Sequence, residues 1–488
     1  MLIFTMADTK CDKLKKTLMR TVARVLPALI LSACSGAKEV KIDHSDVTGS
    51  PVASEIGEYI PLAIAPFEWR GQGAAPINIS SIVAADLRRS GLFSPTAVEN
   101  LPEPSEPADD SMPVEYKKWR MRGIPYFVIG QLYKNISQPK NSHAYTIRFQ
   151  LFDAYQGEML IGFVLESHTE DLRRRTHEVS DLIYEALTRQ RGAFATRIAF
   201  SSKKRDAKGD DQYAIEIADA DAANPKSIVV SREPLYAPVW SPDGNDIAYV
   251  TMEKRHPQIY LQHLATGRRR LLADLNNLTS TPAWSPDGKK MALSLAQKTK
   301  PCIYLLEVQS KALQCVINRP GVIADPAWAP DGKSLLYTSG QSGSGQIHQY
   351  NVATGEDRQL TLSGLRNHHP IFAPDGLSIA FITDTADNRN QVMIMDLATQ
   401  KIRTVDKMGN VKSLNFSPNG RMIIYATNIA QGGKQKSVLS VVSVDGHVKQ
   451  FFSIAGADIG EPAWSPFGAR LPTSAQTTSS PAYKAHYY

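Results

Sequence analysis

The second half of the chain alternates short apolar runs with polar turns. Runs of four to six residues follow Pro-Asp-Gly or Pro-Asn-Gly turns, and further runs such as 258–264 and 268–272 come after them. The runs directly after the turns are residues 247–250, 291–295, 335–339, 379–383 and 422–427. Runs of this length, rich in β-branched and aromatic residues and bounded by turn formers, predict strands. Together with the segment before each turn they give four strands per unit.

The turns belong to a phrase of the form aromatic-Ser/Ala-Pro-Asp-Gly that recurs along the chain. Its aromatic residues are Trp240, Trp284, Trp328, Phe372, Phe416 and Trp464, at intervals of 44, 44, 44, 44 and 48 residues. Four strands at such a period predict a β-propeller. Proline presets its own φ, Asp or Asn accepts local backbone hydrogen bonds, and Gly adopts positive φ, so the phrase is expected to be structural and not catalytic.

The first and last units are incomplete in complementary ways. Residues 197–202, 213–219 and 227–231 resemble a unit without its first strand, whereas 461–465 is a first strand with nothing after it. Joined, they form one further blade and close the ring, which leaves no long exposed sheet edge. We therefore expect an all-β six-bladed propeller over residues 196–466.

The segment before the propeller has a mixed pattern. Apolar residues follow helical spacing over 79–87 and again over 179–187, and Asn78 and Gly91 are suited to begin and end the first helix. Strands are expected at 59–66, 126–131, 143–153 and 158–166. The pattern predicts an α/β domain over residues 58–195.

The N-terminus reads as a secretory signal peptide. Basic residues precede an apolar stretch at 25–31 and small residues at 32–37, and Met19 is an alternative start. The apolar stretch is shorter than the roughly 20 residues of a membrane span. We expect residues 1–37 to be the signal peptide and cleavage before Lys38, with lipidation of Cys34 as the alternative. Residues 38–57 would then be an extended segment and 467–488 a disordered polar tail.

The net charge bears on the kind of partner, and the cysteine content bears on whether a disulfide forms. The net charge is +7, of which residues 1–37 supply +4, so the mature chain is only mildly basic and gives no reason to expect a nucleic-acid partner. Its remaining cysteines, Cys302 and Cys315, fall on neighbouring strands of one blade. The hairpin register places them away from directly opposite positions, so we expect two free thiols in preference to a disulfide.

With both parts in view, the chain resembles the TolB family. The matching residues are 64–67 with 73–76, the helix phrase Ile-Val-Ala-Ala-Asp-Leu-Arg-Arg-Ser-Gly-Leu-Phe at 82–93, residues 192–194 with 197–199, and Pro-Ala-Trp-Ser-Pro at 462–466. The resemblance implies a non-enzymatic periplasmic protein of the bacterial Tol-Pal system, without cofactor. Such proteins bind the peptidoglycan-associated lipoprotein Pal through the propeller and TolA through an N-terminal segment, and support outer-membrane constriction and envelope integrity during cell division. The chain departs from the family in its longer C-terminal tail.

The resemblance assigns the TolA contact to a stretch that follows the signal peptide. Its residues are Glu39, Val40, Lys41, Ile42 and Asp43, whose alternation suits a strand that joins the edge of another sheet. The alternative is a flexible tail left after processing.

The Pal contact is expected at one mouth of the propeller channel. The first strand of each unit is innermost, so the residues just before the repeated phrase lie at that mouth. They differ in every blade, as a recognition surface requires. The candidate contacts are Tyr236, Thr281, Asp325, His368, His369 and Glu461.

Metal binding and peptidase activity fit the sequence less well than protein binding does. Adjacent residues of a strand point to opposite faces, so His368 and His369 are expected to be poorly placed to chelate one metal ion, and no metal site is predicted. A peptidase of the prolyl oligopeptidase type needs a Gly-x-Ser-x-Gly elbow in a hydrolase domain, and no such elbow is present. A periplasmic propeller that binds a glycan or another small molecule remains the alternative.

Overall fold

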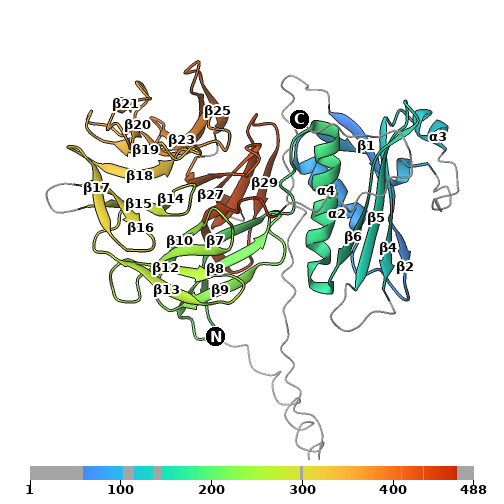
Figure 1. Cartoon of the computed structure of the whole chain (residues 1–488), viewed down its shortest axis with the longest axis horizontal. Helices are drawn as coiled ribbons and strands as arrows, with labels where there is room; N and C mark the ends of the chain where they lie inside the picture. Colours follow the sequence, from blue (N-terminus) through green and yellow to red (C-terminus); the bar gives the residue numbers. More distant parts are fainter. Residues whose placement is uncertain are drawn as a thin grey trace, which may run out of the picture. The chain divides into compact units, whose positions relative to one another are not determined.

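The computed structural model describes residues 59–102, 115–135, 144–296, 301–407, 409–431 and 434–469, and it shows an α/β domain followed by a six-bladed β-propeller (Figure 1). The predicted fold class is therefore confirmed. The predicted signal peptide, the extended segment 38–57 and the tail from residue 470 onward lie outside the described residues.

The α/β domain is built on one six-stranded sheet. Its strand order is β3-β1-β4-β5-β6, and β2 also pairs with β4. β1 runs parallel to β3 and β4, whereas β4, β5 and β6 form an antiparallel meander. The strands are β1 (Ile60–Ile64), β2 (Glu68–Arg70), β3 (Phe93–Pro95), β4 (Tyr126–Lys134), β5 (Tyr145–Asp153) and β6 (Glu158–Ser167).

Helices cover both faces of this sheet. α2 (Ile79–Arg89) and α4 (Leu172–Thr188) pack on one face, where Val83 and Ile183 are fully buried against Phe149. The short α3 (Tyr116–Arg120) covers the other face and stacks Trp119 on Phe127 at a centroid distance of 4.3 Å. Short 3-10 turns occur at Val98–Asn100 and Thr169–Asp171.

The predicted ends of α2 are confirmed. The Asn78 Oδ1 atom accepts the backbone N–H of Ser81 at 3.0 Å, and Gly91 follows the last turn with a φ of +74°. Among the described helices, none is long and apolar enough to cross a membrane.

The propeller consists of six antiparallel four-stranded sheets, five of which use consecutive strands. The first sheet contains β10 (Leu235–Trp240), β11 (Asp246–Thr251), β12 (Gln258–His263) and β13 (Arg269–Asp274). The second contains β14 (Ala283–Trp284), β15 (Lys290–Leu295), β16 (Cys302–Glu307) and β17 (Leu313–Asn318). The third contains β18 (Ile323–Trp328), β19 (Ser334–Ser339), β20 (Gln346–Asn351) and β21 (Asp357–Gln359). The fourth contains β22 (Asn367–Phe372), β23 (Ser378–Asp384), β24 (Asn390–Asp396) and β25 (Ile402–Asp406). The fifth is β26 (Lys412–Phe416), β27 (Met422–Gln431), β28 (Lys434–Ser443) and β29 (Lys449–Phe452).

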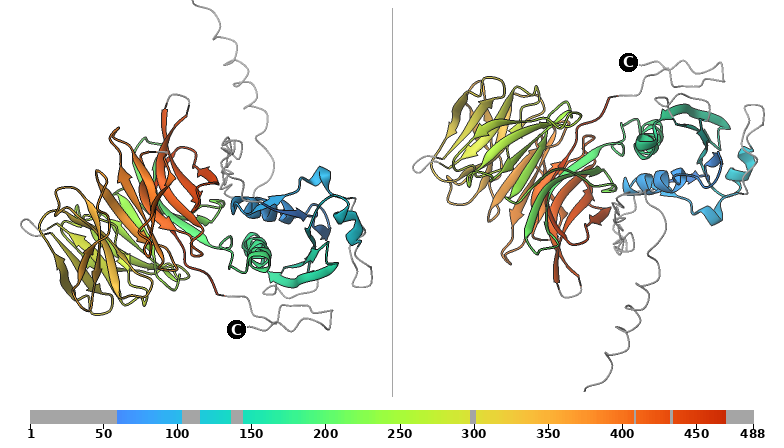
Figure 2. Two further views of the ribbon diagram at one scale, coloured as in Figure 1. Left: turned by 90° about the horizontal axis from the view of Figure 1, so that it is seen from above. Right: turned by 90° about the horizontal axis from the view of Figure 1, so that it is seen from below.

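The sixth sheet joins the two ends of the propeller sequence. Its order is β30-β7-β8-β9, with β30 (Ala457–Trp464), β7 (Arg197–Arg205), β8 (Asp211–Asp219) and β9 (Lys226–Ser231). β30 pairs antiparallel with β7, and Trp464 lies opposite Ile198. This pairing confirms the predicted closure of the ring. Figure 2 shows the propeller from two further directions.

The repeated Pro-Asp-Gly turns have the predicted structural role. In the first complete blade the Asp243 Oδ1 atom accepts the backbone N–H of Asn245 at 3.1 Å, and Gly244 has a φ of +71°. The same acceptor bond and a positive φ at glycine recur after Trp284, Trp328, Phe372 and Phe416. Each turn is thus stabilised by its own residues. This structural role accounts for the repetition of the turn, and no catalytic role is needed to explain it.

The prediction of free thiols in the second blade is wrong. Cys302 and Cys315 form a disulfide, with Cα atoms 6.0 Å apart. They are indeed not opposite each other, because Cys302 pairs with Asn318 and Cys315 pairs with Tyr304. However, the register shifts between Ile303 and Tyr304, and this irregularity moves the outer strand enough for the diagonal pair to meet.

Candidate functional site

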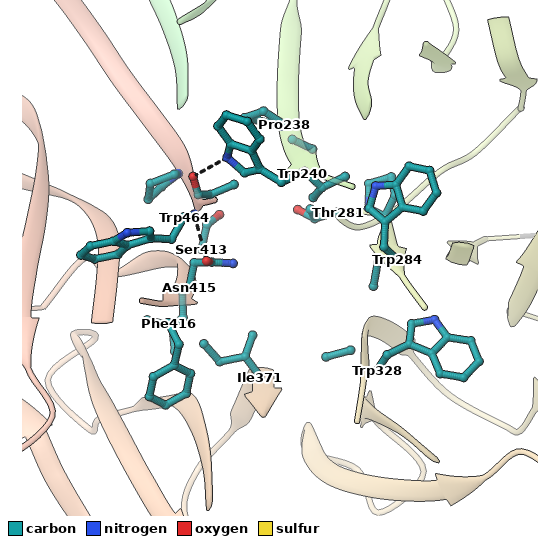
Figure 3. Close-up of a pocket in the computed structure, with 18 of the residues that line it drawn as sticks. Pro238, Trp240, Thr281, Trp284, Trp328, Ile371, Ser413, Asn415, Phe416 and Trp464 are labelled. Atoms are coloured by element: carbon teal, nitrogen blue, oxygen red, sulfur yellow. Dashed lines mark hydrogen bonds between the residues drawn. The ribbon is translucent and has the colours of Figure 1, made fainter. Parts of the chain in front are cut away.

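The innermost strands of all six blades surround a cavity of about 400 Å³. β10, β14, β18, β22, β26 and β30 supply its lining, which is dominated by prolines and by the aromatic residues of the repeated phrase. Figure 3 shows these side chains around the cavity; the Trp240 indole N–H donates to the Ala463 carbonyl oxygen at 3.1 Å and so ties neighbouring blades together. This wall is mostly apolar.

One residue from each blade forms a ring in this lining, always three positions before the aromatic residue; it lies in the inner strand in five blades and just before β14 in the remaining blade. The members of this ring are Ala237, Thr281, Asp325, His369, Ser413 and Glu461. All except Thr281 have φ between +50° and +55°, and in those five blades the pairing of the first two strands shifts register at the same place. The resulting β-bulge turns one side chain per blade toward the cavity.

The ring contains four of the six residues predicted for the Pal contact. Thr281, Asp325, His369 and Glu461 line the cavity, whereas Tyr236 and His368 are not part of its lining. Those two residues precede the bulge and lie in regular register opposite Val250 and Ile382. Tyr236 instead lines a neighbouring cavity of about 300 Å³ together with Glu461.

Sequence reasoning missed Ala237 and Ser413 as ring members. Neither of them is among the six predicted contacts. The signal was available, because both stand at the same distance before an aromatic residue as the four ring members that were chosen.

Glu461 is a half-buried carboxyl at the mouth. Its Oε2 atom accepts the Ala237 backbone N–H at 2.8 Å and the Ser201 hydroxyl at 3.1 Å. Burial raises the pKa of Glu461 above its usual value, although these two hydrogen bonds oppose the shift. Burial likewise raises the pKa of Tyr236, with the Glu461 charge adding to the effect.

A second polar cluster lies at the ring positions of the third and fourth blades. The Asp325 Oδ2 atom accepts the Thr338 hydroxyl at 2.9 Å and the His369 backbone N–H at 3.2 Å. The Nδ1 atoms of His368 and His369 are 2.9 Å apart, and the other ring nitrogen of His368 is 3.1 Å from Asp384 Oδ1. Burial lowers the pKa of His368, and the neighbouring His369 adds to this shift.

The prediction that the His368 and His369 side chains point to opposite faces is therefore wrong. It assumed a regular strand, in which adjacent side chains point to opposite faces. The left-handed backbone of His369, with a φ of +50°, turns its ring back toward that of His368. The mouth thus presents carboxylates, imidazoles and a hydroxyl at fixed positions beside an apolar wall, an arrangement suited to recognition of a protein segment.

The residues predicted to contact TolA, Glu39 to Asp43, lie outside the described part of the chain.

Comparison with known proteins gives consistent matches to both domains. Residues 52–160 match the TolB amino-terminal domain and residues 184–468 match the TolB beta propeller domain. The Tol-Pal system protein TolB of Nitrosococcus oceani is 41% identical over 439 residues, which cover 90% of this chain and 97% of the relative. The protein of the same name from Thioalkalivibrio sulfidiphilus is 42% identical over 409 residues, covering 84% of this chain and 91% of the relative. The crystal structure of TolB from Acinetobacter baumannii superposes with a TM-score of 0.74 at 31% identity, covering 84% of this chain and 98% of that one.

Proposed function

Because this chain belongs to the TolB family of Tol-Pal system proteins, we propose that it is a non-enzymatic periplasmic interaction protein that binds Pal at the channel mouth. It would contact TolA through residues 39–43 and support outer-membrane constriction and envelope integrity during cell division. The proposal for Pal rests mainly on one observation: the ring carries a different residue in each of the six blades, on a backbone that is otherwise repeated.

At the ring, unlike side chains are held in fixed positions. A structural position tends to repeat, as the Pro-Asp-Gly turns do, whereas a recognition surface needs unlike groups at fixed places. Asp325 and Glu461 are held by hydrogen bonds to backbone N–H groups of the next blade, so little side-chain freedom would be lost when a partner binds.

The test is a calorimetric titration of the full chain with purified Pal. Thr281→Arg places a long charged side chain in the ring, and Ser310→Arg places the same group on the exposed β16–β17 turn as a matched control. We expect T281R to weaken Pal binding at least tenfold and S310R to leave it unchanged. Equal binding by wild type and T281R, with T281R folded, would exclude the mouth as the Pal site.

The TolA contact is tested separately by deleting residues 39–43. We expect loss of TolA binding with Pal binding retained, since the deleted stretch precedes the α/β domain. Unchanged TolA binding would contradict the assignment. Cell fractionation of the full chain, with recovery in the periplasmic fraction, tests its location.

If the wild-type chain binds neither protein, the apolar cavity becomes the leading candidate for a glycan or small-molecule site. A thermal-shift screen of envelope glycans against the full chain, with T281R beside it, would then reveal a ligand of the cavity.

A further inference from the structure

Three potential metal ligands from two blades converge at the channel mouth. One ligand atom from each of Asp325, His368 and His369 lies within 4.8 Å of the others. The two histidine Nδ1 atoms are 2.9 Å apart, and Asp325 Oδ2 is 3.4 Å from His369 Nδ1. Bond lengths of about 2.0 to 2.2 Å in a tetrahedral zinc site place neighbouring ligand atoms about 3.3 to 3.6 Å apart. The observed spacing therefore fits one ion after the two rings separate slightly.

The backbone explains why adjacent histidines share one centre. His369 has a left-handed φ of +50° at the bulge between His368 and Ile371, so its side chain does not alternate with that of its neighbour. Asp325 holds the equivalent position in the preceding blade, 44 residues earlier, and also has a left-handed φ, of +55°. The same bulge in two adjacent blades thus brings all three groups together.

Outer groups hold the ligands in the orientation that metal binding requires. The His368 Nε2–H donates to Asp384 Oδ1 at 3.1 Å, which leaves the Nδ1 lone pair directed at His369. Carboxylates that accept the second ring N–H are typical partners of metal-binding histidines. The Thr338 hydroxyl and the His369 backbone N–H fix the Asp325 carboxylate in the same way.

We propose that Asp325, His368 and His369 form a binding site for a divalent late transition metal ion, with Zn²⁺ as the representative ion. Two imidazoles and one carboxylate suit Zn²⁺, Ni²⁺ or Cu²⁺ and are a poor set for Ca²⁺ or Mg²⁺, which prefer oxygen ligands. Three protein ligands leave a fourth position for water or for a group of a bound partner. The half-exposed His369 side chain, which lines the cavity, keeps that position accessible.

The experiment is a competition titration of Zn²⁺ between the full chain, freed of metal by a chelator, and a chromophoric chelator. His369→Gln removes a ligand on the more exposed ring and so disturbs folding least. Asp384→Asn removes only the outer carboxylate. His256→Gln is the matched control, because His256 also pairs with a carboxylate, Asp274, on another blade but has no second histidine beside it.

If the site is correct, the variants should differ stepwise in their affinity for Zn²⁺. Wild type and H256Q should bind one equivalent of Zn²⁺ with equal affinity, D384N should bind about tenfold more weakly, and H369Q should lose at least about 100-fold. Zn²⁺ should also raise the thermal unfolding midpoint of wild type and H256Q but not that of H369Q. Titration with Co²⁺ should give the intense visible absorption of a four-coordinate ion in wild type.

Two outcomes would overturn the proposal. One is substoichiometric Zn²⁺ binding by wild type. The other is equal affinity of wild type and folded H369Q, which would place the bound ion elsewhere on the chain. The midpoint of H369Q without metal, compared with that of wild type, establishes whether the variant is folded.

Discussion

Glu461 and Ala237 connect the last inner strand of the propeller to that of the first complete blade. The Glu461 Oε2 atom accepts the Ala237 backbone N–H at 2.8 Å, across 224 residues of sequence. Asp325 makes the corresponding bond to the His369 backbone N–H, across 44 residues. At these two points a ring side chain satisfies the backbone donor that the bulge of the next blade removes from its sheet.

Replacing Glu461 should destabilise the protein. Glu461→Ala leaves the Ala237 N–H in a buried place without this acceptor, so we expect the free energy of unfolding to fall by about 1 to 3 kcal/mol. Glu461→Gln keeps an acceptor oxygen of the same shape and should cost less. Denaturant unfolding monitored by fluorescence measures both. Glu307→Ala, which removes a surface ion pair with Lys290, is the control and should change the value by less than about 1 kcal/mol.

Removing the disulfide should also lower stability. Cys302 and Cys315 enclose a short loop, and the double replacement by serine should cost about 2 to 4 kcal/mol through the greater freedom of the unfolded chain. The unfolding midpoint of wild type in reductant should fall to that of the double variant, and reductant should not affect the double variant. Alkylation of Cys315 in the non-reduced, exported protein would show that the bond does not form.

The glycine of the repeated turn should matter for stability and not for binding. Gly244 has a φ of +71°, and an added Cβ would lie 3.2 Å from the Pro466 ring, so Gly244→Ala should cost about 1 to 2 kcal/mol. Gly468→Ala is the control, because an added Cβ there meets no atom within 4 Å. Thermal unfolding measures the effect. A loss of Pal affinity in folded G244A would contradict the purely structural role of the turn.

Asp181 should make the stability of the α/β domain depend on pH. Burial raises the pKa of this carboxyl from 3.8 to about 7, although its bonds to the Phe194 and Ala195 backbone N–H groups oppose the shift. The native state therefore holds a proton that the unfolded state has released between about pH 4 and pH 7. This contribution is fully present below pH 3.8 and is lost as the pH rises through 7.

The variant Asp181→Asn isolates that contribution. Relative to D181N, wild type should lose stability by a few kcal/mol between about pH 4 and pH 8. Denaturant unfolding at several pH values measures the difference, and Asp210→Asn, at an exposed carboxyl, should follow wild type. Burial lowers the pKa of the nearby His177, but the Asp86 carboxylate outweighs it and raises the pKa overall. Wild type and D181N both retain the Asp86–His177 pair, so the contribution of this pair to pH dependence cancels from the difference in their stability. Parallel curves for wild type and D181N would contradict the prediction.

Much of the fold was predictable because its signals are local. The turn at Gly244, the cap at Asn78 and the pairing of β30 with β7 each follow from a pattern within a few residues or from a constant repeat length. The candidate site was predictable only in part. The repeat placed the residues before each aromatic phrase at the channel mouth and led to Tyr236 as a contact, but it could not show that the next residue, Ala237, is the one that faces the cavity.

The sequence by itself determined a six-bladed propeller behind an α/β domain, since apolar periodicity and turn chemistry act over short distances. Only the tertiary structure decided the disulfide, the direction of the His369 ring and the meeting of Asp325 with the two histidines. These features depend on register shifts between strands and on contacts between neighbouring blades. A register shift is fixed by how whole strands pack together, so it leaves no distinct pattern among the residues that it moves.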